Sequence, residues 1–228
     1  MMPKTMSNEA AGFAAQRPWD ARLAAKLVAP LRDSWVTPNH LTTVRLGVGL
    51  AAAGAFVVGS YAWSNVGALL LVLSNFLDHT DGELARLSGK SSRIGHVYDL
   101  ASDALVTILL FLAIGVGLGD RMPPPLPVGT AAGGAIAGCS VALIFYLRMR
   151  IEAIQGKEAI RQASLAGFET EDVLYLLPLV TLCDGLGVFL VLATCCAPLF
   201  AIWVAVDYLR TIRKPRSTDA RSNAEVSS

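Results

Sequence analysis

Four aspartates lie in stretches of the chain that are otherwise largely apolar. Asp78 and Asp81 are three residues apart, and Asp99 and Asp103 are four residues apart. Residues at these spacings share one face of an α-helix, so each pair presents both carboxylates in one direction. The two stretches are joined by a short loop, which predicts antiparallel neighbouring helices with Asp81 level with Asp99 and Asp78 level with Asp103. We therefore expect two stacked rungs of carboxylates.

Such a cluster needs compensation if its helices lie in a membrane. One ionised side chain at the centre of a membrane helix costs about 2.5–3.5 kcal/mol, and this chain places four carboxylates together. Protonation of the carboxyls and solvation at the helix ends are two alternatives. Bound divalent cations neutralise the cluster directly, and an all-oxygen ligand set favours Mg²⁺, Mn²⁺ or Ca²⁺ over Zn²⁺. The residues therefore predict a site for one or two divalent ions.

The residues that follow Asp81 indicate what these ions would act on. Gly82 and Ala85 leave one side of the helix without bulk, so that a ligand can approach the backbone. Arg86, four residues after Gly82, adds a permanent cation suited to a phosphate. Metal-bound carboxylates beside a phosphate-binding arginine are typical of phosphoryl transfer.

The helices that carry these residues belong to a membrane protein. Of the 228 residues, 54% are hydrophobic and only 16% are charged, whereas ordinary soluble domains carry about 25% charge. With a window of about 20 residues, the length that crosses a bilayer, the sequence predicts an all-α integral membrane protein with six transmembrane helices. The expected spans are 40–60, 62–84, 96–118, 127–147, 172–186 and 187–209.

The distribution of basic residues predicts the orientation. Seventeen of the 19 lysines and arginines lie before the first span, after the sixth, or in the loops on that same side, and Arg121 alone lies in the opposite loops. Positively charged loops face the cytoplasm, so we expect a multi-pass protein of a bacterial-type inner or plasma membrane. Both termini would be cytoplasmic and the carboxylates would face the cytoplasmic leaflet. The net charge of +1 gives no general attraction to nucleic acid.

The remaining segments complete the expected domain organisation. Residues 1–38 form a cytoplasmic N-terminal segment, residues 39–210 the six-helix membrane domain, and residues 211–228 a disordered cytoplasmic tail. Within 20–34, an apolar side predicts an amphipathic interfacial helix on the inner leaflet, with an ordinary connecting helix as the alternative. The expected apolar residues are Leu23, Leu27, Val28 and Leu31.

Two charged residues near the aspartates have less certain surroundings. Arg45 lies inside the first expected span, where snorkelling, an ion pair and contact with the carboxylate site are all open. Glu83 lies off the Asp81 face and is expected to meet the lipid headgroup region.

The complete pattern resembles the signature of the CDP-alcohol phosphotransferase (phosphatidyltransferase) family. The signature residues are Asp78, Asp81, Gly82, Ala85, Arg86, Gly95, Asp99 and Asp103, with every gap between them in agreement. The segment from Thr37 to Thr42, Thr-Pro-Asn-His-Leu-Thr, also resembles the opening segment of that family. The resemblance implies transfer of a substituted phosphoryl group from a CDP-linked donor to an alcohol, with release of CMP.

The resemblance also implies a role for each site residue. Two Mg²⁺ or Mn²⁺ ions would be bound by the four aspartates, namely Asp78, Asp81, Asp99 and Asp103. Asp103 would also serve as the catalytic base that takes the hydroxyl proton of the acceptor. Gly82 and Arg86 would bind the CDP moiety, and the weaker expected contacts are Ser92, Asn39 and Thr42. A homodimer is a further implication.

The identity of the two substrates stays open. CDP-diacylglycerol as donor and a small polar alcohol as acceptor are favoured, while transfer of a CDP-linked headgroup to diacylglycerol needs the same signature. A phosphorylated acceptor would suit the basic residues Arg148, Arg150, Lys157 and Arg161, and a cationic one would suit the acidic residues Glu169, Glu171 and Asp172. A carboxylate-lined cation transporter and an inactive scaffold are rival readings. The transporter does not explain Gly82 and Arg86, and the intact aspartates argue against the scaffold.

Overall fold

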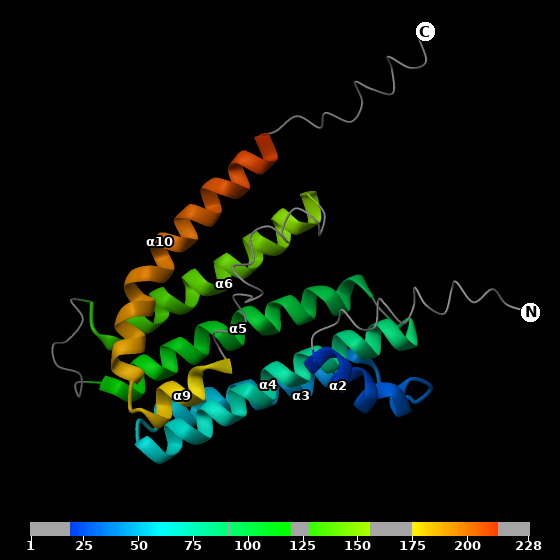
Figure 1. Ribbon diagram of the computed structural model, residues 1–228, viewed down its shortest axis with the longest axis horizontal. Coiled ribbons are helices and arrows are strands. Elements are labelled where there is room, and N and C mark those ends of the chain that lie inside the picture. Colours follow the sequence, from blue (N-terminus) through cyan, green and yellow to red (C-terminus); the bar gives the residue numbers. More distant parts are fainter. Residues whose placement is uncertain (1–18, 91, 120–127, 156–174, 214–228) are drawn as a thin grey trace, which may run out of the picture.

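The computed structural model describes residues 19–90, 92–119, 128–155 and 175–213, and regular structure in these ranges is entirely helical. Figure 1 shows a bundle of long helices with shorter helices beside it. In chain order the elements are α2 (Trp19–Val28), η1 (Ala29–Leu31), α3 (Pro38–Val57), α4 (Tyr61–Ser88), α5 (Arg93–Leu118), α6 (Thr130–Gln155), α9 (Leu177–Leu182) and α10 (Leu186–Arg213). The all-α prediction is confirmed for the described residues.

Four of the described helices are long and apolar enough to cross a membrane, which supports a multi-pass membrane protein. They are α3, α5, α6 over Thr130–Ile154, and α10. The expected second span coincides with α4, which has 28 residues but is not among these four. Its C-terminal part contains Asp78, Asp81, Glu83 and Arg86, and these charges lower its average hydropathy.

The expected fifth span, 172–186, is wrong as a single crossing helix. Its described part contains only α9, whose six residues are about 9 Å long at 1.5 Å per residue. Pro178 stands in the first turn of α9, and Asp184 follows it with a left-handed φ of 52°. The backbone therefore turns before α10 begins. Residues 172–174 lie outside the described residues.

Local capping fixes where the site helices begin and end. Pro38 opens α3, and the backbone N–H of Thr37 donates to His40 Nδ1 at 3.2 Å. Helix α4 ends at Gly89, which adopts the left-handed φ of 67° that favours glycine. Ser92 caps α5 by accepting a hydrogen bond from the Gly95 backbone at 2.9 Å. Because α4 ends at Ser88 and α5 begins at Arg93, only four residues connect the two helices.

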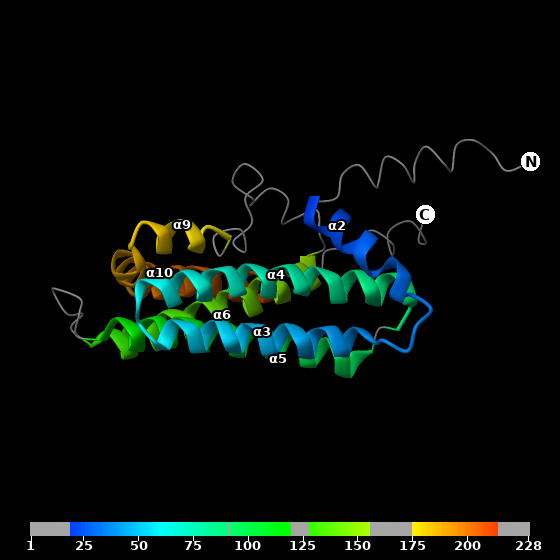
Figure 2. The same ribbon diagram turned by 90° about the horizontal axis from the view of Figure 1, so that it is seen from below.

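Helix α3 lies between α4 and α5, and this arrangement corrects the prediction that those two helices are direct neighbours. Figure 2 shows α3 and α4 running side by side, and α3 also packs along α5. In the described part of the chain, α4 and α5 make no close backbone contact with each other. A Cβ added to Gly49 of α3 would lie 2.7 Å from the Val106 side chain and 3.2 Å from Ser74 Oγ. The absence of a side chain at Gly49 allows this close approach on both sides.

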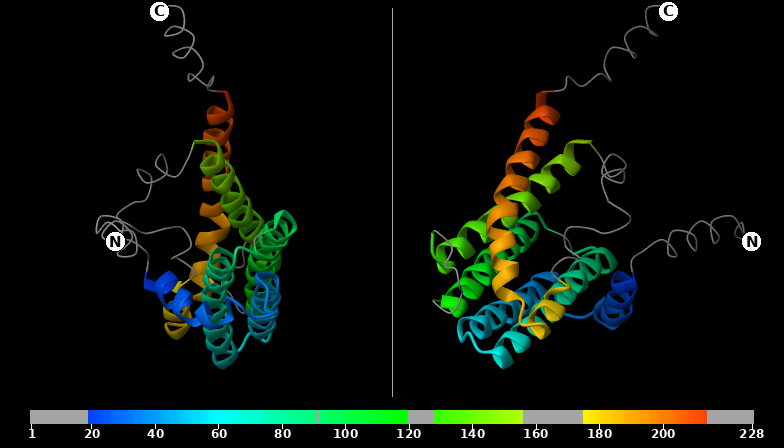
Figure 3. Two further views of the ribbon diagram at one scale, coloured as in Figure 1. Left: turned by 90° about the vertical axis from the view of Figure 1, so that its right-hand side faces the viewer. Right: turned by 60° about the vertical axis from the view of Figure 1, so that its left-hand side comes forward.

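The other long helices extend the bundle on the far side of α5. Helix α5 packs along α6, and α6 packs along α10. A Cβ at Gly138 of α6 would lie 2.9 Å from Ile108 Cα, so this glycine serves packing within the chain. Towards its C-terminal end α10 leans away from α3 and α4 (Figure 3).

The N-terminal helix packs differently from the sequence prediction. Helix α2 packs on α4, with Ala24 and Val28 buried. Leu23 and Leu27, which were expected on the same apolar side as Val28, are 44% and 55% exposed. The buried side is therefore centred on the smaller residue Ala24, which allows α2 to approach α4. The side chains of Leu23 and Leu27 therefore remain exposed on the side of α2 that does not contact α4.

Candidate active site

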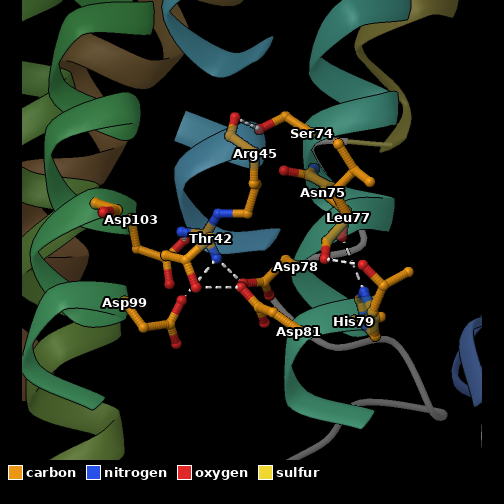
Figure 4. A network of polar contacts seen from close by, with 12 residues as sticks. Thr42, Arg45, Ser74, Asn75, Leu77, Asp78, His79, Asp81, Asp99 and Asp103 are labelled. Atoms are coloured by element: carbon orange, nitrogen blue, oxygen red, sulfur yellow. Dashed lines mark hydrogen bonds and ion pairs between the residues drawn. The ribbon is translucent and has the colours of Figure 1, made fainter. Parts of the chain in front are cut away.

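Three of the four predicted aspartates converge at one point. Asp78 comes from α4, and Asp99 and Asp103 come from α5. One carboxylate oxygen from each of these residues lies within 4.8 Å of the others. Figure 4 shows the carboxylates pointing towards the same space from opposite sides, with α3 behind them. The helix faces predicted from the i, i+3 and i, i+4 spacing thus meet, although the helices that bear them are not direct neighbours.

Asp81 has a different environment from the other three aspartates. It is only 5% exposed, and its Oδ2 accepts a hydrogen bond from Thr42 Oγ1 at 2.7 Å. Asp81 does not belong to the group of mutually close oxygens among the described residues. Asp81 therefore lies apart from the close set formed by the other three carboxylates, with Thr42 of α3 as its hydrogen-bond partner.

Arg45 of α3 occupies the centre of the carboxylate cluster. Its side chain is 2% exposed. Nη1 donates to Asp99 Oδ1 at 3.0 Å, and Nη2 donates to Asp103 Oδ1 at 2.6 Å. Nη1 also forms an ion pair with Asp78. Of the possibilities that the sequence left open for Arg45, the structure selects the ion pair within the site.

Sequence reasoning did not assign Arg45 to the site, although one signal for it was present. Arg45 lies three residues after Thr42, and this spacing places both side chains on one face of α3. A single cation inside an apolar span also needs partners. Which carboxylates serve as those partners depends on the position of α3 in the bundle, and the sequence pattern does not encode that position.

The donor set fits a hard divalent cation. Three carboxylates supply oxygen ligands, which suit Mg²⁺ or Mn²⁺. The side chains of Asp78, Asp99 and Asp103 are 35%, 36% and 51% exposed, so all three can be reached from outside the bundle. Three negative charges and one guanidinium leave a formal charge of −2, which one divalent ion would neutralise.

The two residues expected to bind the CDP moiety follow Asp78 on α4, Gly82 after four residues and Arg86 after eight. An added Cβ at the exposed Gly82 would have no heavy atom within 4 Å, so the backbone is open there. Arg86 is 59% exposed and donates to Glu83 Oε1 at 2.7 Å. Glu83 is only 4% exposed, so its expected position among lipid headgroups is wrong. The buried Glu83 carboxylate holds the Arg86 guanidinium one turn away from Gly82.

The weaker predicted contacts fall into two groups. Thr42 is buried and acts on Asp81, as described above. Asn39 and Ser92 are exposed at the starts of α3 and α5. A Cβ at Gly95 would lie 2.7 Å from Asn39 Oδ1 and 3.0 Å from Ser92 Oγ. Gly95 therefore leaves the space in which the Asn39 side chain packs against the cap of α5.

A cavity of about 580 Å³ adjoins the carboxylates. Asp78, Asp103 and Arg45 line one part of it, and apolar residues such as Leu110 and Leu143 line another. A volume of this order accommodates a small-molecule ligand. The arrangement thus joins a charged cluster to a largely apolar space formed by four long helices.

Comparison with known proteins gives several sequence relatives. The chain is 32% identical over 147 residues to a bifunctional IPC transferase and DIPP synthase from Rubrobacter xylanophilus, a match that covers 64% of this chain and 30% of the relative. It is 39% identical over 87 residues to a CDP-diacylglycerol–glycerol-3-phosphate 3-phosphatidyltransferase from Cereibacter sphaeroides, covering 36% of this chain and 38% of the relative. The chain therefore spans well under half the length of these curated relatives.

One solved structure shares the fold. The crystal structure of Mycobacterium tuberculosis phosphatidylinositol phosphate synthase with CDP-DAG bound superposes with a TM-score of 0.59 at 20% sequence identity, over 87% of this chain and 98% of that chain. The sequence profile of CDP-alcohol phosphatidyltransferases matches residues 35–209, which include all four aspartates, Arg45, and the long helices up to the last turn of α10. The chain is thus a member of the CDP-alcohol phosphatidyltransferase family.

Proposed function

We propose that this protein transfers a phosphatidyl group from CDP-diacylglycerol to the hydroxyl of a small polar alcohol and releases CMP. The observation that carries the proposal is the convergence of Asp78, Asp99 and Asp103 beside a cavity within a membrane-type helix bundle. The activity of the Cereibacter sphaeroides relative and the ligand of the Mycobacterium tuberculosis structure support CDP-diacylglycerol as donor. The product would enter phospholipid biosynthesis.

The four aspartates would hold two divalent ions, Mg²⁺ or Mn²⁺. When bound, such ions supply positive charge that stabilises the diphosphate and the leaving CMP. Asp78, Asp99 and Asp103 offer mutually close oxygens. Asp81 would contribute through its carboxylate, which Thr42 orients by hydrogen bonding. Each aspartate is held by a described partner, so the set of oxygens is preorganised.

Asp103 is the proposed general base. It is the most exposed of the three clustered carboxylates at 51%, and it lines the cavity. An acceptor hydroxyl in that cavity would pass its proton to Asp103 while its oxygen forms a bond to the β-phosphorus of the donor. The bond between that phosphorus and the bridging oxygen breaks, and CMP leaves with the bridging oxygen. Arg45 keeps Asp103 in place through Nη2.

The CDP moiety would bind over Gly82. The open backbone at Gly82 allows a phosphate or a base to approach, and Arg86 is exposed enough to contact it. Asn39 and Ser92 are exposed at the same end of the bundle as proposed further contacts. Glu83 would set the position of the Arg86 guanidinium.

The membrane arrangement and the assembly belong to the same proposal. Both termini and the carboxylates would face the cytoplasmic side, in agreement with the basic residues Arg210 and Arg213 at the end of α10. Helix α2 would lie on the inner leaflet with Leu23 and Leu27 towards lipid. The protein would act as a homodimer.

An assay of CMP release tests the proposal. Purified protein is incubated with CDP-diacylglycerol radiolabelled in the cytidine, with Mg²⁺ and with a panel of alcohols that includes glycerol phosphate, inositol phosphate and choline. We expect CMP release with at least one acceptor and its loss in the presence of EDTA. Absence of CMP release with every acceptor, together with CMP release from CDP-choline in the presence of diacylglycerol, would show the reverse arrangement of substrates. Absence of both activities would contradict the proposed function.

A further inference from the structure

Arg45 contacts three of the four signature aspartates. Its guanidinium contacts Asp78 on α4 and both Asp99 and Asp103 on α5. The side chain is 2% exposed, whereas the three carboxylates are between 35% and 51% exposed. A buried guanidinium is always charged and has a rigid fork of donors. Arg45 is therefore a fixed cation on the inner side of an accessible carboxylate cluster.

The backbone around Arg45 is held on both sides. The carbonyl oxygen of Arg45 accepts a hydrogen bond from Ser74 Oγ at 3.2 Å. One turn further along α3, Gly49 packs against Val106 of α5 and Ser74 of α4. These contacts leave little freedom for α3 to move away from α4 or α5. The guanidinium is therefore positioned by the bundle and in turn positions carboxylates on two helices whose backbones make no close contact with each other.

We infer that Arg45 is a positioning residue that gathers the carboxylates before a divalent ion binds and limits how tightly that ion is held. This inference rests on the metal site of the proposed function. Without Arg45, three carboxylates would repel one another across the gap between α4 and α5. The positive charge of Arg45 reduces the net charge of the cluster from −3 to −2, which weakens its attraction for a cation. The guanidinium also shares the carboxylate oxygens with the bound ion.

The two parts of this role predict opposite effects for one substitution. Loss of the guanidinium should lower the thermal stability of the metal-free protein, because the three carboxylates lose the positive charge of Arg45. The same loss should strengthen metal binding, because the positive charge of Arg45 no longer repels the positively charged metal ion. A residue that only supports the fold would lower stability and metal affinity together.

The experiment measures Mn²⁺ binding and thermal stability of the purified full-length protein in detergent micelles. Arg45→Met keeps an unbranched side chain without the charge, and Arg45→Lys keeps the charge without the fork. Arg148→Met is the matched control, because Arg148 also lies in a long apolar helix but stacks on Phe200 at 5.4 Å. Binding is followed by electron paramagnetic resonance of free Mn²⁺, and unfolding is followed in EDTA and in saturating Mn²⁺.

For Arg45→Met we expect a melting temperature in EDTA that is lower by on the order of 10 °C. Mn²⁺ should restore most of that difference and bind at least about tenfold more tightly than to the unsubstituted protein. Arg45→Lys keeps the positive charge, so its Mn²⁺ affinity should stay close to that of the unsubstituted protein, while its melting temperature in EDTA should fall because the fork of donors is lost. Arg148→Met should leave the Mn²⁺ affinity unchanged.

Equal or weaker Mn²⁺ binding by Arg45→Met would overturn the inference while leaving the metal site intact. Absence of Mn²⁺ binding by the unsubstituted protein would overturn the metal site and this inference with it. If Arg45→Met cannot be purified in folded form, the neutral variant Arg45→Gln decides the question: a Mn²⁺ affinity equal to or weaker than that of the unsubstituted protein would overturn the inference.

Discussion

Two residues on one face of α3 organise carboxylates that belong to other helices. Thr42 donates a hydrogen bond to the buried Asp81, and Arg45 contacts the three aspartates that are mutually close. A buried carboxylate without a hydrogen-bond donor is unfavourable, and so is a cluster of like charges without a cation. Helix α3 supplies both, which explains how a membrane-type bundle tolerates four aspartates near one another.

The first prediction at the residue scale concerns the proposed base. Asp103→Asn retains the shape of the side chain but cannot take a proton from the acceptor hydroxyl. We expect CMP release to fall at least about 100-fold, the usual effect of removing a general base. Asp207→Asn on α10 is the matched control and should retain activity. Unchanged turnover by Asp103→Asn would contradict the assignment of the base.

The second prediction concerns the hydrogen bond between Thr42 and Asp81. Thr42→Val removes the hydroxyl at nearly constant volume and leaves the buried carboxylate without this donor. We expect the free energy of unfolding to fall by about 1–3 kcal/mol and the Mg²⁺ concentration for half-maximal activity to rise. Thr42→Ser keeps the donor and should resemble the unsubstituted protein. Equal effects in both variants would show that packing, and not the hydrogen bond, is the contribution of Thr42.

At the scale of elements, close packing of α3 decides whether the site forms. Gly49 faces Val106 and Ser74, so any larger residue must separate α3 from α5 or α4. Gly47 lies two residues away on the same helix, and an added Cβ there would meet no heavy atom within 4 Å. The two glycines differ only in what they face, which makes them a matched pair.

The third prediction uses that pair. Gly49→Leu should lower the free energy of unfolding by about 1–3 kcal/mol through overpacking and should abolish CMP release, because Arg45 and Thr42 move with α3. Gly47→Leu should leave both properties close to those of the unsubstituted protein. Thermal unfolding and the CMP assay measure the two effects. Similar behaviour of both variants would contradict the close packing of α3 between α4 and α5.

The sequence predicted the positions of the helices along the chain better than it predicted which helices pack against each other. The expected spans over 40–60, 96–118 and 187–209 fall on α3, α5 and α10, since apolar length is a local property. The insertion of α3 between α4 and α5 was not predictable from periodicity, because it depends on which faces pack. The boundary expected between 186 and 187 falls close to the observed turn at Asp184, but the shortness of α9 was missed because 172–186 is apolar almost throughout.

At the scale of the whole molecule, the two ends of the bundle have different chemistry. Tyr61, at the start of α4, donates its hydroxyl hydrogen to the carbonyl oxygen of Leu182 in α9. Asp78 lies 17 residues further along α4, which is about 25 Å at 1.5 Å per residue. The turn after α9 and the carboxylates therefore lie at opposite ends of α4, and the proposed orientation puts them on opposite sides of the membrane.

The fourth prediction tests that orientation. Cys183 follows α9 and is exposed. In a protein with Cys139, Cys195 and Cys196 replaced by serine, a membrane-impermeant maleimide should label Cys183 in right-side-out vesicles only. With Cys183 also replaced by serine, Lys90→Cys, in the loop between α4 and α5, should be labelled in inside-out vesicles only. The reverse pattern would contradict the cytoplasmic placement of the carboxylates.

The sequence by itself determined that this chain is a helical membrane-type protein with a carboxylate signature, and that Asp78, Asp99 and Asp103 can share a site. Composition and spacing along one helix decide those properties, and both are local. Only the tertiary structure decided that Arg45 completes the cluster, that Thr42 holds Asp81 apart from it, and that Glu83 is buried and accepts a hydrogen bond from Arg86. The physical reason is that these contacts depend on which helix lies between which others, and packing across the whole bundle sets that order.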